Sequence, residues 1–270
     1  MNKPKDEPGL QTILSHCGRN LEASGGYVNV PPYEGSTILH DDMEDLFGRV
    51  DNHLYGDGTA QTYGTDGGPT HEAFYDAMNK LEGGAGTWAF STGLAGCTIP
   101  MMAFLKTGDH MLVTDSVYGP TRQFCEVLLK NFGVEAEFYE PTIGAGIEKL
   151  IRPNTRLIYM ESPGTHTFEM QDVPAIAAVA RKYNIVTMID NTYATPLNFQ
   201  PLKHGVDVVV HSATKYICGH SDVLMSTVTC NEKTWKQVRD VCKMTGQYAS
   251  AQSVYLGLRG LRTLKAVSYT

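Results

Sequence analysis

The segment Val206–Asp222, VDVVVHSATKYICGHSD, places a lysine just beyond an apolar run. The run is typical of a buried β-strand, and Lys215 follows it after a short stretch of small and hydroxyl residues. A lysine amine at the mouth of a strand can form a Schiff base with a carbonyl compound. A single lysine is more often a solvated surface charge, so its role depends on the groups that meet it.

Polar and glycine residues follow the other predicted strands in the same way. They are Ser91–Gly96 after TWAF, Asp115–Tyr118 after MLVT, Glu161–Pro163 after LIYM, Asp190–Thr192 after VTMI and Ser212–Lys215 after VVVH. Because an open parallel sheet binds ligands at the carboxyl ends of its strands, we expect these groups to share one edge. That edge would carry a glycine turn, an aromatic ring, a carboxylate, hydroxyls and a lysine.

Each of these groups also has a simpler interpretation. Gly93 could simply allow a tight turn, Tyr118 could be a packing residue, and Asp190 could be a helix cap. Together with Lys215, however, they supply what pyridoxal phosphate requires. The lysine would hold the cofactor, the carboxylate would keep the pyridine nitrogen protonated, the ring would stack, and backbone N–H groups would bind the phosphate.

Several other classes of protein are disfavoured by composition and motifs. The segment STGLAG lacks the GxGxxG order of a dinucleotide site, and no GxxxxGK[ST] run is present. With 22 basic and 29 acidic residues the net charge is 22 − 29 = −7, which gives no basic footprint for nucleic acid. No apolar run approaches the ~18 residues of a membrane span, and the start of the chain has no secretory signal, so we expect a cytoplasmic protein without a membrane or nucleic-acid partner.

The cysteines and histidines predict neither disulfides nor a metal site. The six cysteines are scattered without a CxxC pair, which indicates free and mostly buried thiols. The nine histidines show no HExxH spacing. We therefore expect no metal.

The order of predicted elements indicates an α/β fold. Strands are expected over 86–92, 110–115, 134–140, 155–162, 185–192, 207–214 and 223–231, and helices over 71–82, 93–108, 119–132, 144–151, 173–184, 201–206, 232–245 and from 253 to the end of the chain. Alternation of apolar strands with helices predicts a mostly parallel sheet of about seven strands, with helices on both faces. We expect an extended N-terminal arm over 1–65, a cofactor-binding domain over 66–261, and the start of a further domain over 262–270.

Five motifs resemble signatures of one enzyme family. They are SATKYICGHSD, DNTYATP, MESPG, LEGGAGTWAFSTGLAG and LRGLRTL. The chain resembles the Cys/Met-metabolism family of pyridoxal phosphate enzymes, which has the aspartate-aminotransferase fold (fold type I). Within it, VYGPTRQFC and QDVPAIAAVA are most similar to bacterial cystathionine β-lyases. The resemblance implies β-elimination of cystathionine to homocysteine, pyruvate and ammonia, in a homotetramer built from dimers; γ-elimination or γ-synthesis by sister enzymes remains the alternative.

The resemblance also implies a role for each site residue. Lys215 would carry the cofactor and move protons, Asp190 would pair with the pyridine nitrogen, and Tyr118 would stack on the ring and assist proton transfer. The remaining cofactor contacts would be the N–H groups of Gly93 and Leu94, the side chains of Thr192, Ser212 and Thr214, and Tyr63 reaching the phosphate of a neighbouring subunit. The arm over 1–65 would bring that tyrosine to its partner.

Three features depart from the family pattern. Thr65 stands where the family usually has a phosphate-binding arginine, which predicts weaker cofactor binding. Ser226 replaces a glycine and would crowd the backbone packed against it. The family continues past Thr270 into a smaller domain that carries the carboxylate-binding arginine, so we expect that the chain lacks this domain. A non-catalytic remnant is the alternative from another class.

Overall fold

A seven-stranded sheet forms the centre of the protein. The computed structural model describes residues 9–22, 24–56 and 58–267. The strands are β1 (Gly86–Phe90), β2 (His110–Thr114), β3 (Glu135–Tyr139), β4 (Thr155–Glu161), β5 (Val186–Asp190), β6 (Val208–His211) and β7 (Ser226–Cys230). Their order is β1-β7-β6-β5-β4-β2-β3, and only β7 runs antiparallel to its neighbours. The predicted fold class, a mostly parallel α/β sheet, is confirmed.

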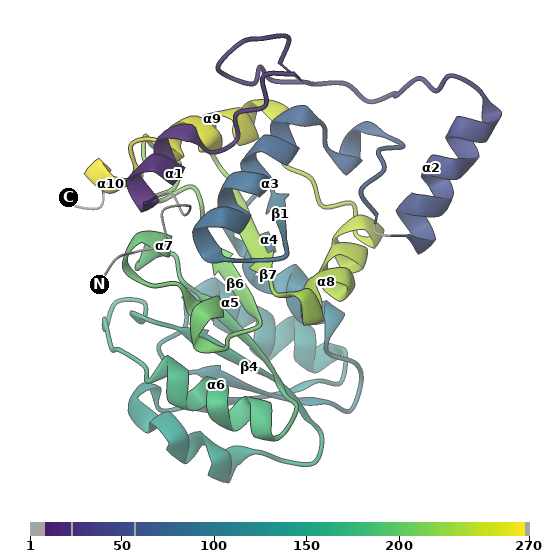
Figure 1. Cartoon of the computed structure of the whole chain (residues 1–270). Helices are drawn as coiled ribbons and strands as arrows, with labels where there is room; N and C mark the ends of the chain where they lie inside the picture. The colour runs from purple at the N-terminus through teal and green to yellow at the C-terminus, as the bar shows by residue number, and fades with distance from the viewer. Residues whose placement is uncertain (1–8, 23, 57, 268–270) are drawn as a thin grey trace.

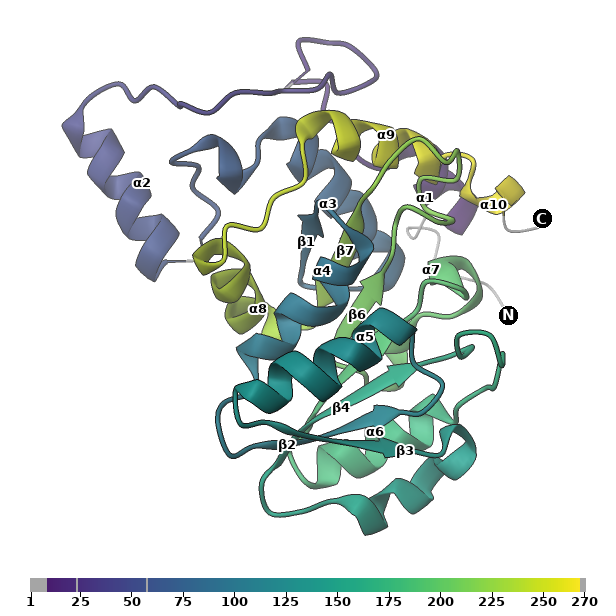
Figure 2. The same cartoon turned by 180° about the vertical axis from the view of Figure 1, so that it is seen from behind.

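Helices cover both faces of this sheet (Figures 1 and 2). The α-helices among the described residues are α1 (Leu10–His16), α2 (Met43–Tyr55), α3 (Pro69–Glu82), α4 (Gly93–Thr98), α5 (Gly119–Gln123), α6 (Val173–Lys182), α7 (Thr195–Asn198), α8 (Glu232–Met244), α9 (Ala251–Leu261) and α10 (Leu264–Val267). In Figure 1, α6 lies on the near face of the sheet. Figure 2 shows the molecule from behind, and there α4, α5 and α8 lie on the near face. None of the helices in the described part of the chain is long and apolar enough to cross a membrane.

The period-two alternation of the strands explains the two covered faces. Met111 and Val113 on β2 pack into the core under α4, α8 and the segment Phe124–Leu129 that follows α5, whereas Leu112 between them packs into the core under α6. Side chains of successive strand residues point to opposite faces, so a strand buried on both sides must be apolar throughout. All residues of β1, β2, β6 and β7 are buried, as this requires.

The helix expected over 93–108 is shorter than predicted. The α-helix α4 ends at Thr98, and a 3₁₀ segment over Ile99–Ala103 follows it. Pro100 lies in the first turn of that segment and has no N–H to continue the α-helical ladder, which explains the change. In place of the helix expected over 144–151, the structure has a 3₁₀ segment, Pro141–Leu150, that breaks at Gly144.

The N-terminal arm contains two helices that the composition did not predict. Helix α1 contributes the buried Leu14 to the core, so this part of the arm packs on its own domain. Helix α2 buries no residue and lies beside the main body in both views (Figures 1 and 2). Its Met43, Phe47 and Leu54 recur at helical spacing and are exposed.

The helix expected from 253 onward divides into α9 and α10, with a break at Arg262 and Thr263. The expectation that the chain stops inside a helix at Thr270 lies outside the described residues.

Candidate active site

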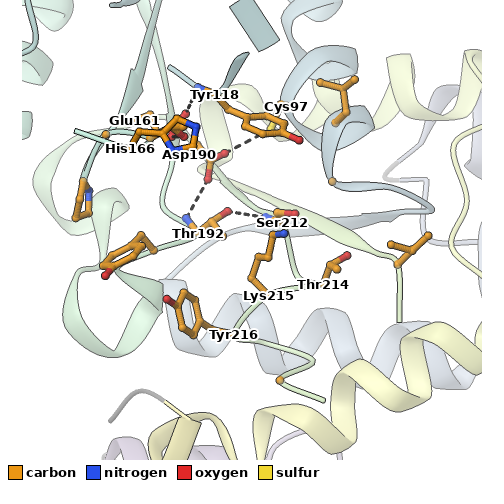
Figure 3. Close-up of a pocket in the computed structure, with 18 of the residues that line it drawn as sticks. Cys97, Tyr118, Glu161, His166, Asp190, Thr192, Ser212, Thr214, Lys215 and Tyr216 are labelled. Atoms are coloured by element: carbon orange, nitrogen blue, oxygen red, sulfur yellow. Dashed lines mark hydrogen bonds between the residues drawn. The ribbon is translucent and has the colours of Figure 1, made fainter. Parts of the chain in front are cut away.

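A cavity of about 1000 Å³ lies at the carboxyl ends of β4, β5 and β6. Predicted site residues that line it are Gly93, Leu94, Tyr118, Asp190, Thr192, Ser212, Thr214 and Lys215. In the view of Figure 3 the Tyr118 ring lies above Asp190 and the Lys215 side chain lies below it. The sheet topology therefore brings together groups that lie more than a hundred residues apart in the sequence.

Lys215 reaches the cavity from the tight turn after β6. Its backbone N–H donates to the Ser212 carbonyl at 3.0 Å, which closes the turn. The Thr214 hydroxyl donates to the Met225 carbonyl at 3.1 Å and accepts from the Met225 N–H at 2.9 Å. These bonds fasten the turn to the segment before β7 and leave the Lys215 side chain exposed. The Thr214 hydroxyl, predicted as a cofactor contact, thus donates its proton to the Met225 carbonyl.

Asp190 ends β5 and is held by donors from two directions. Its Oδ1 accepts the Thr192 N–H at 2.9 Å, and its Oδ2 lies 3.5 Å from the Cys97 thiol, which donates to it. Thr192 in turn accepts the Ser212 N–H at 2.7 Å and so ties the end of β5 to the end of β6 (Figure 3). The residue is only 7% exposed. Asp190 therefore has a defined position on the cavity wall.

The glycine turn before α4 has no room for a larger residue. An alanine Cβ at Gly93 would overlap the Ser212 hydroxyl. The Thr92 hydroxyl caps the helix by accepting the Ala95 N–H at 3.3 Å. Gly93 thus allows the backbone at the start of α4 to lie directly against the turn that precedes Lys215.

The expectation that Ser226 would crowd the backbone is wrong. Its hydroxyl donates to the Thr92 carbonyl at 2.7 Å, and the residue is fully buried. The space exists because the facing residue is Gly96, where a Cβ would overlap the Ser226 hydroxyl. The serine therefore anchors the turn that begins α4.

Glu161 is a cavity residue to which sequence reasoning gave no role. It ends β4 in register with Asp190, accepts the Tyr118 N–H at 2.8 Å, and also accepts the Thr165 hydroxyl. Burial and the neighbouring Asp190 carboxylate raise the pKa of Glu161 to about 8. Its position in the sequence could have identified it: Glu161 is the last residue of a predicted strand, and the next strand along the chain ends in Asp190.

Aromatic side chains at the cavity also escaped the sequence analysis. The rings of Phe168 and Tyr193 meet edge to face at 5.3 Å between centroids, and those of Tyr193 and Tyr216 at 5.9 Å. Phe168 and His166 adopt left-handed backbone conformations, with φ of 57° and 63°. Phe168 after β4, Tyr193 after β5 and Tyr216 after β6 thus form an aromatic part of the cavity wall.

Tyr63 is the one predicted cofactor contact that does not line this cavity. Its side chain is 50% exposed, and the neighbouring Thr65 is exposed as well. Tyr63 directly precedes a 3₁₀ turn of the arm, Gly64–Asp66, and Thr65 lies within that turn. Within one chain, the structure does not bring them to Lys215.

The six cysteines are free and buried, as predicted. Among residues 9–22, 24–56 and 58–267, no cluster of three His, Cys, Asp or Glu side chains could hold a metal ion.

Comparison with known proteins agrees with this geometry. The model of the family described as Cys/Met metabolism PLP-dependent enzyme matches residues 11–267. The chain belongs to this family. A Rhizobium johnstonii protein named "Putative cystathionine beta-lyase" is 46% identical over 256 residues, covering 95% of this chain and 63% of that protein. Cystathionine beta-lyase MetC of Escherichia coli is 39% identical over 257 residues, covering 94% of this chain and 64% of the relative.

A solved structure confirms the fold. The crystal structure of metB from Corynebacterium glutamicum superimposes with a TM-score of 0.87 at 30% identity, covering 98% of this chain and 66% of that chain. This chain thus spans roughly two thirds of the length of the proteins it matches.

The residues at the cavity fit pyridoxal phosphate, the cofactor of the family. Lys215 is exposed and faces the cavity, and Asp190 presents a buried carboxylate for a protonated ring nitrogen. Gly93 and Leu94 line the cavity at the start of α4, where backbone N–H groups can bind a phosphate. These three features fit a lysine-bound cofactor, whereas Tyr63 and Thr65 lie away from this cavity.

Proposed function

We propose that this chain forms the cofactor-binding part of a carbon–sulfur lyase that cleaves cystathionine by β-elimination. Cystathionine and water would yield homocysteine, pyruvate and ammonia. The observation that carries the proposal is the convergence of exposed Lys215, buried Asp190 and the Gly93 turn on one cavity. The β-lyase names of several relatives favour β- over γ-elimination.

Each side chain would have a defined task. Lys215 would bind the cofactor and then remove the α-proton of the substrate. Tyr118 would stack on the cofactor ring and assist proton transfer, and Asp190 would hold the charge of the ring nitrogen. Gly93, Leu94 and Ser212 would bind the phosphate. When bound, pyridoxal phosphate supplies an electron sink for the bond that breaks at Cα.

Visible absorbance and peptide mapping test the site. The wild type should develop the visible band of lysine-bound pyridoxal phosphate, and borohydride should fix the label on the Lys215 peptide. Lys215→Ala should show neither. No band in the wild type would favour the non-catalytic alternative.

Product analysis tests the reaction. Pyruvate from cystathionine would support β-elimination, whereas 2-oxobutyrate would support γ-elimination, as in the cystathionine gamma-lyase of Lactobacillus plantarum, a structural neighbour with a TM-score of 0.86. A Wolbachia pipientis relative, 36% identical, is named L-alanine/L-glutamate racemase, so the assay should include D-alanine formation from L-alanine.

We further propose that residues 1–65 contact a second copy of the chain in a homotetramer, with 66–261 as the cofactor domain and 262–270 beginning another domain. The exposed apolar face of α2, formed by Met43, Phe47 and Leu54, supports this assembly. We place the enzyme in the cytoplasm, because its six cysteines are free and thiols stay reduced there. Sedimentation of the wild type and of a Phe47→Ser variant would test the proposed homotetramer, because the variant should dissociate.

Thr65→Arg should strengthen cofactor binding about tenfold. A guanidinium can bind a phosphate with two charge-assisted hydrogen bonds, which threonine cannot supply. The dissociation constant of pyridoxal phosphate should be measured for both proteins. An unchanged constant would mean that another residue already compensates for the missing arginine.

A further inference from the structure

Glu161 and Asp190 form a pair of buried carboxyl groups on the cavity wall. They end the neighbouring strands β4 and β5 in register, so their side chains lie on the same face of the sheet. Each residue is only 7% exposed, and both line the cavity (Figure 3). Two carboxylates this close to each other and this far from water are unfavourable unless one of them is neutral.

Glu161 joins two loops that border the cavity. Its Oε2 accepts the backbone N–H of Tyr118, in the loop between β2 and α5, at 2.8 Å. Its Oε1 contacts the hydroxyl of Thr165, in the loop between β4 and α6. The same loops meet where the Thr165 N–H donates to the Ser116 carbonyl at 2.9 Å. The position of Tyr118 therefore depends on the side chain of Glu161.

The hydrogen bonds indicate where Glu161 would carry a proton. A backbone N–H can only donate, so Oε2 must remain an acceptor toward Tyr118. A neutral Glu161 therefore carries its proton on Oε1, where the Thr165 hydroxyl can turn to accept it. Both contacts survive in the neutral acid, and no buried donor loses its partner.

Burial and the Asp190 charge raise the pKa of Glu161 to about 8, which agrees with this geometry. Other ionisable groups interact with the same carboxyl or line the same cavity. They are Cys97 on α4, Tyr159 on β4, Tyr118 before α5, His166 after β4, Tyr193 after β5, and Lys215, Tyr216 and Asp222 after β6.

We propose that Glu161 is a positioning residue that holds Tyr118 at the cofactor cavity while neutral, leaving the negative charge to Asp190. That Tyr118 stacks on a cofactor rests on the proposed function, whereas the contact between Glu161 and Tyr118 does not. A cation paired with Asp190 would relieve the repulsion between the two carboxyl groups.

The first test needs no cofactor. Tyrosine amides labelled with ¹⁵N can be followed by NMR against pH, and the Tyr118 resonance is identified by its loss in Tyr118→Phe. In the wild type it should shift with an apparent pKa near 8, and in Glu161→Gln it should not. The matched control Glu232→Gln removes an exposed carboxylate on α8 and should leave the shift unchanged. A Tyr118 amide that does not titrate, or that titrates equally in Glu161→Gln, would overturn the proposal.

The second test measures the dissociation constant of pyridoxal phosphate by visible absorbance. Glu161→Gln should bind within about twofold of wild type, because its amide oxygen can accept from Tyr118 and its amide N–H can donate to Thr165. Glu161→Ala should bind about tenfold more weakly. In a Tyr118→Ala background the same alanine change should have little further effect.

Additive losses in that double-mutant cycle would show that Glu161 does not act through Tyr118, which would refute the proposal. Far-UV circular dichroism checks that the alanine variants fold, and the glutamine comparison does not depend on them. If the wild type bound no cofactor, the proposed function would fail, whereas the NMR test would still decide the role of Glu161.

Discussion

The buried pair of Glu82 and His211 allows a quantitative test of how the site is supported. Glu82 ends α3, and its Oε1 lies 2.5 Å from Nε2 of His211, the last residue of β6. The side chains are 0% and 1% exposed. His211 directly precedes Ser212, so this pair secures the strand end that carries the lysine turn into the cavity.

Removing one partner should be much more damaging than removing both. Glu82→Leu leaves a buried imidazole without its acceptor, and the other ring nitrogen, Nδ1, already has no partner. Breaking such a pair costs about 3–5 kcal/mol. Glu82→Gln keeps a neutral acceptor for Nε2 and should cost about 1–2 kcal/mol. The double variant Glu82→Leu/His211→Phe should recover most of the loss, since no buried polar group is stranded.

Urea unfolding followed by circular dichroism measures these differences. At a slope of about 3 kcal/mol/M, the loss in Glu82→Leu corresponds to a midpoint lower by about 1–2 M. The reasoning would be refuted if Glu82→Leu unfolded within 0.3 M or so of the wild type, which is about 1 kcal/mol. It would also fail if the double variant were no more stable than the single one.

Three further predictions concern the turns and the carboxyl pair. Gly93→Ala should weaken pyridoxal phosphate binding at least about tenfold, since its Cβ overlaps the Ser212 hydroxyl, and adding Ser212→Ala should restore part of the affinity in a binding titration. Gly96→Ala should destabilise the fold by about 2 kcal/mol, and adding Ser226→Gly should reverse most of it in thermal unfolding. Glu161 keeps its proton up to about pH 8 when folded but loses it near its usual pKa of 4.5 when unfolded. The cofactor-free wild type should therefore lose stability relative to Glu161→Gln as pH rises from about 5 to 8, by up to about 1.4 kcal/mol per pH unit, in urea titrations at three pH values.

Much of the site could be predicted because it follows from strand ends. Lys215, Asp190 and Gly93 each come just after an apolar run, and parallel strands must bring their carboxyl ends to one edge. Apolar periodicity and turn residues are local signals, so the alternating strands and helices were readable as well. Of the two arm helices that were missed, α2 lies in a segment of turn-forming composition and buries none of its residues.

Pairings between distant side chains have no such local signal, and only the tertiary structure decided them. The sequence contains Ser226 and Gly96 as separate residues; their complementary shapes appear only where β7 passes α4. The contact of Cys97 with Asp190 and the bond from Tyr118 to Glu161 likewise span strands whose order the sequence does not state. By itself, the sequence determined which chemical groups this protein brings to one edge of its sheet. Their hydrogen bonds and protonation states depend on burial and distance, which exist only once the strands are side by side.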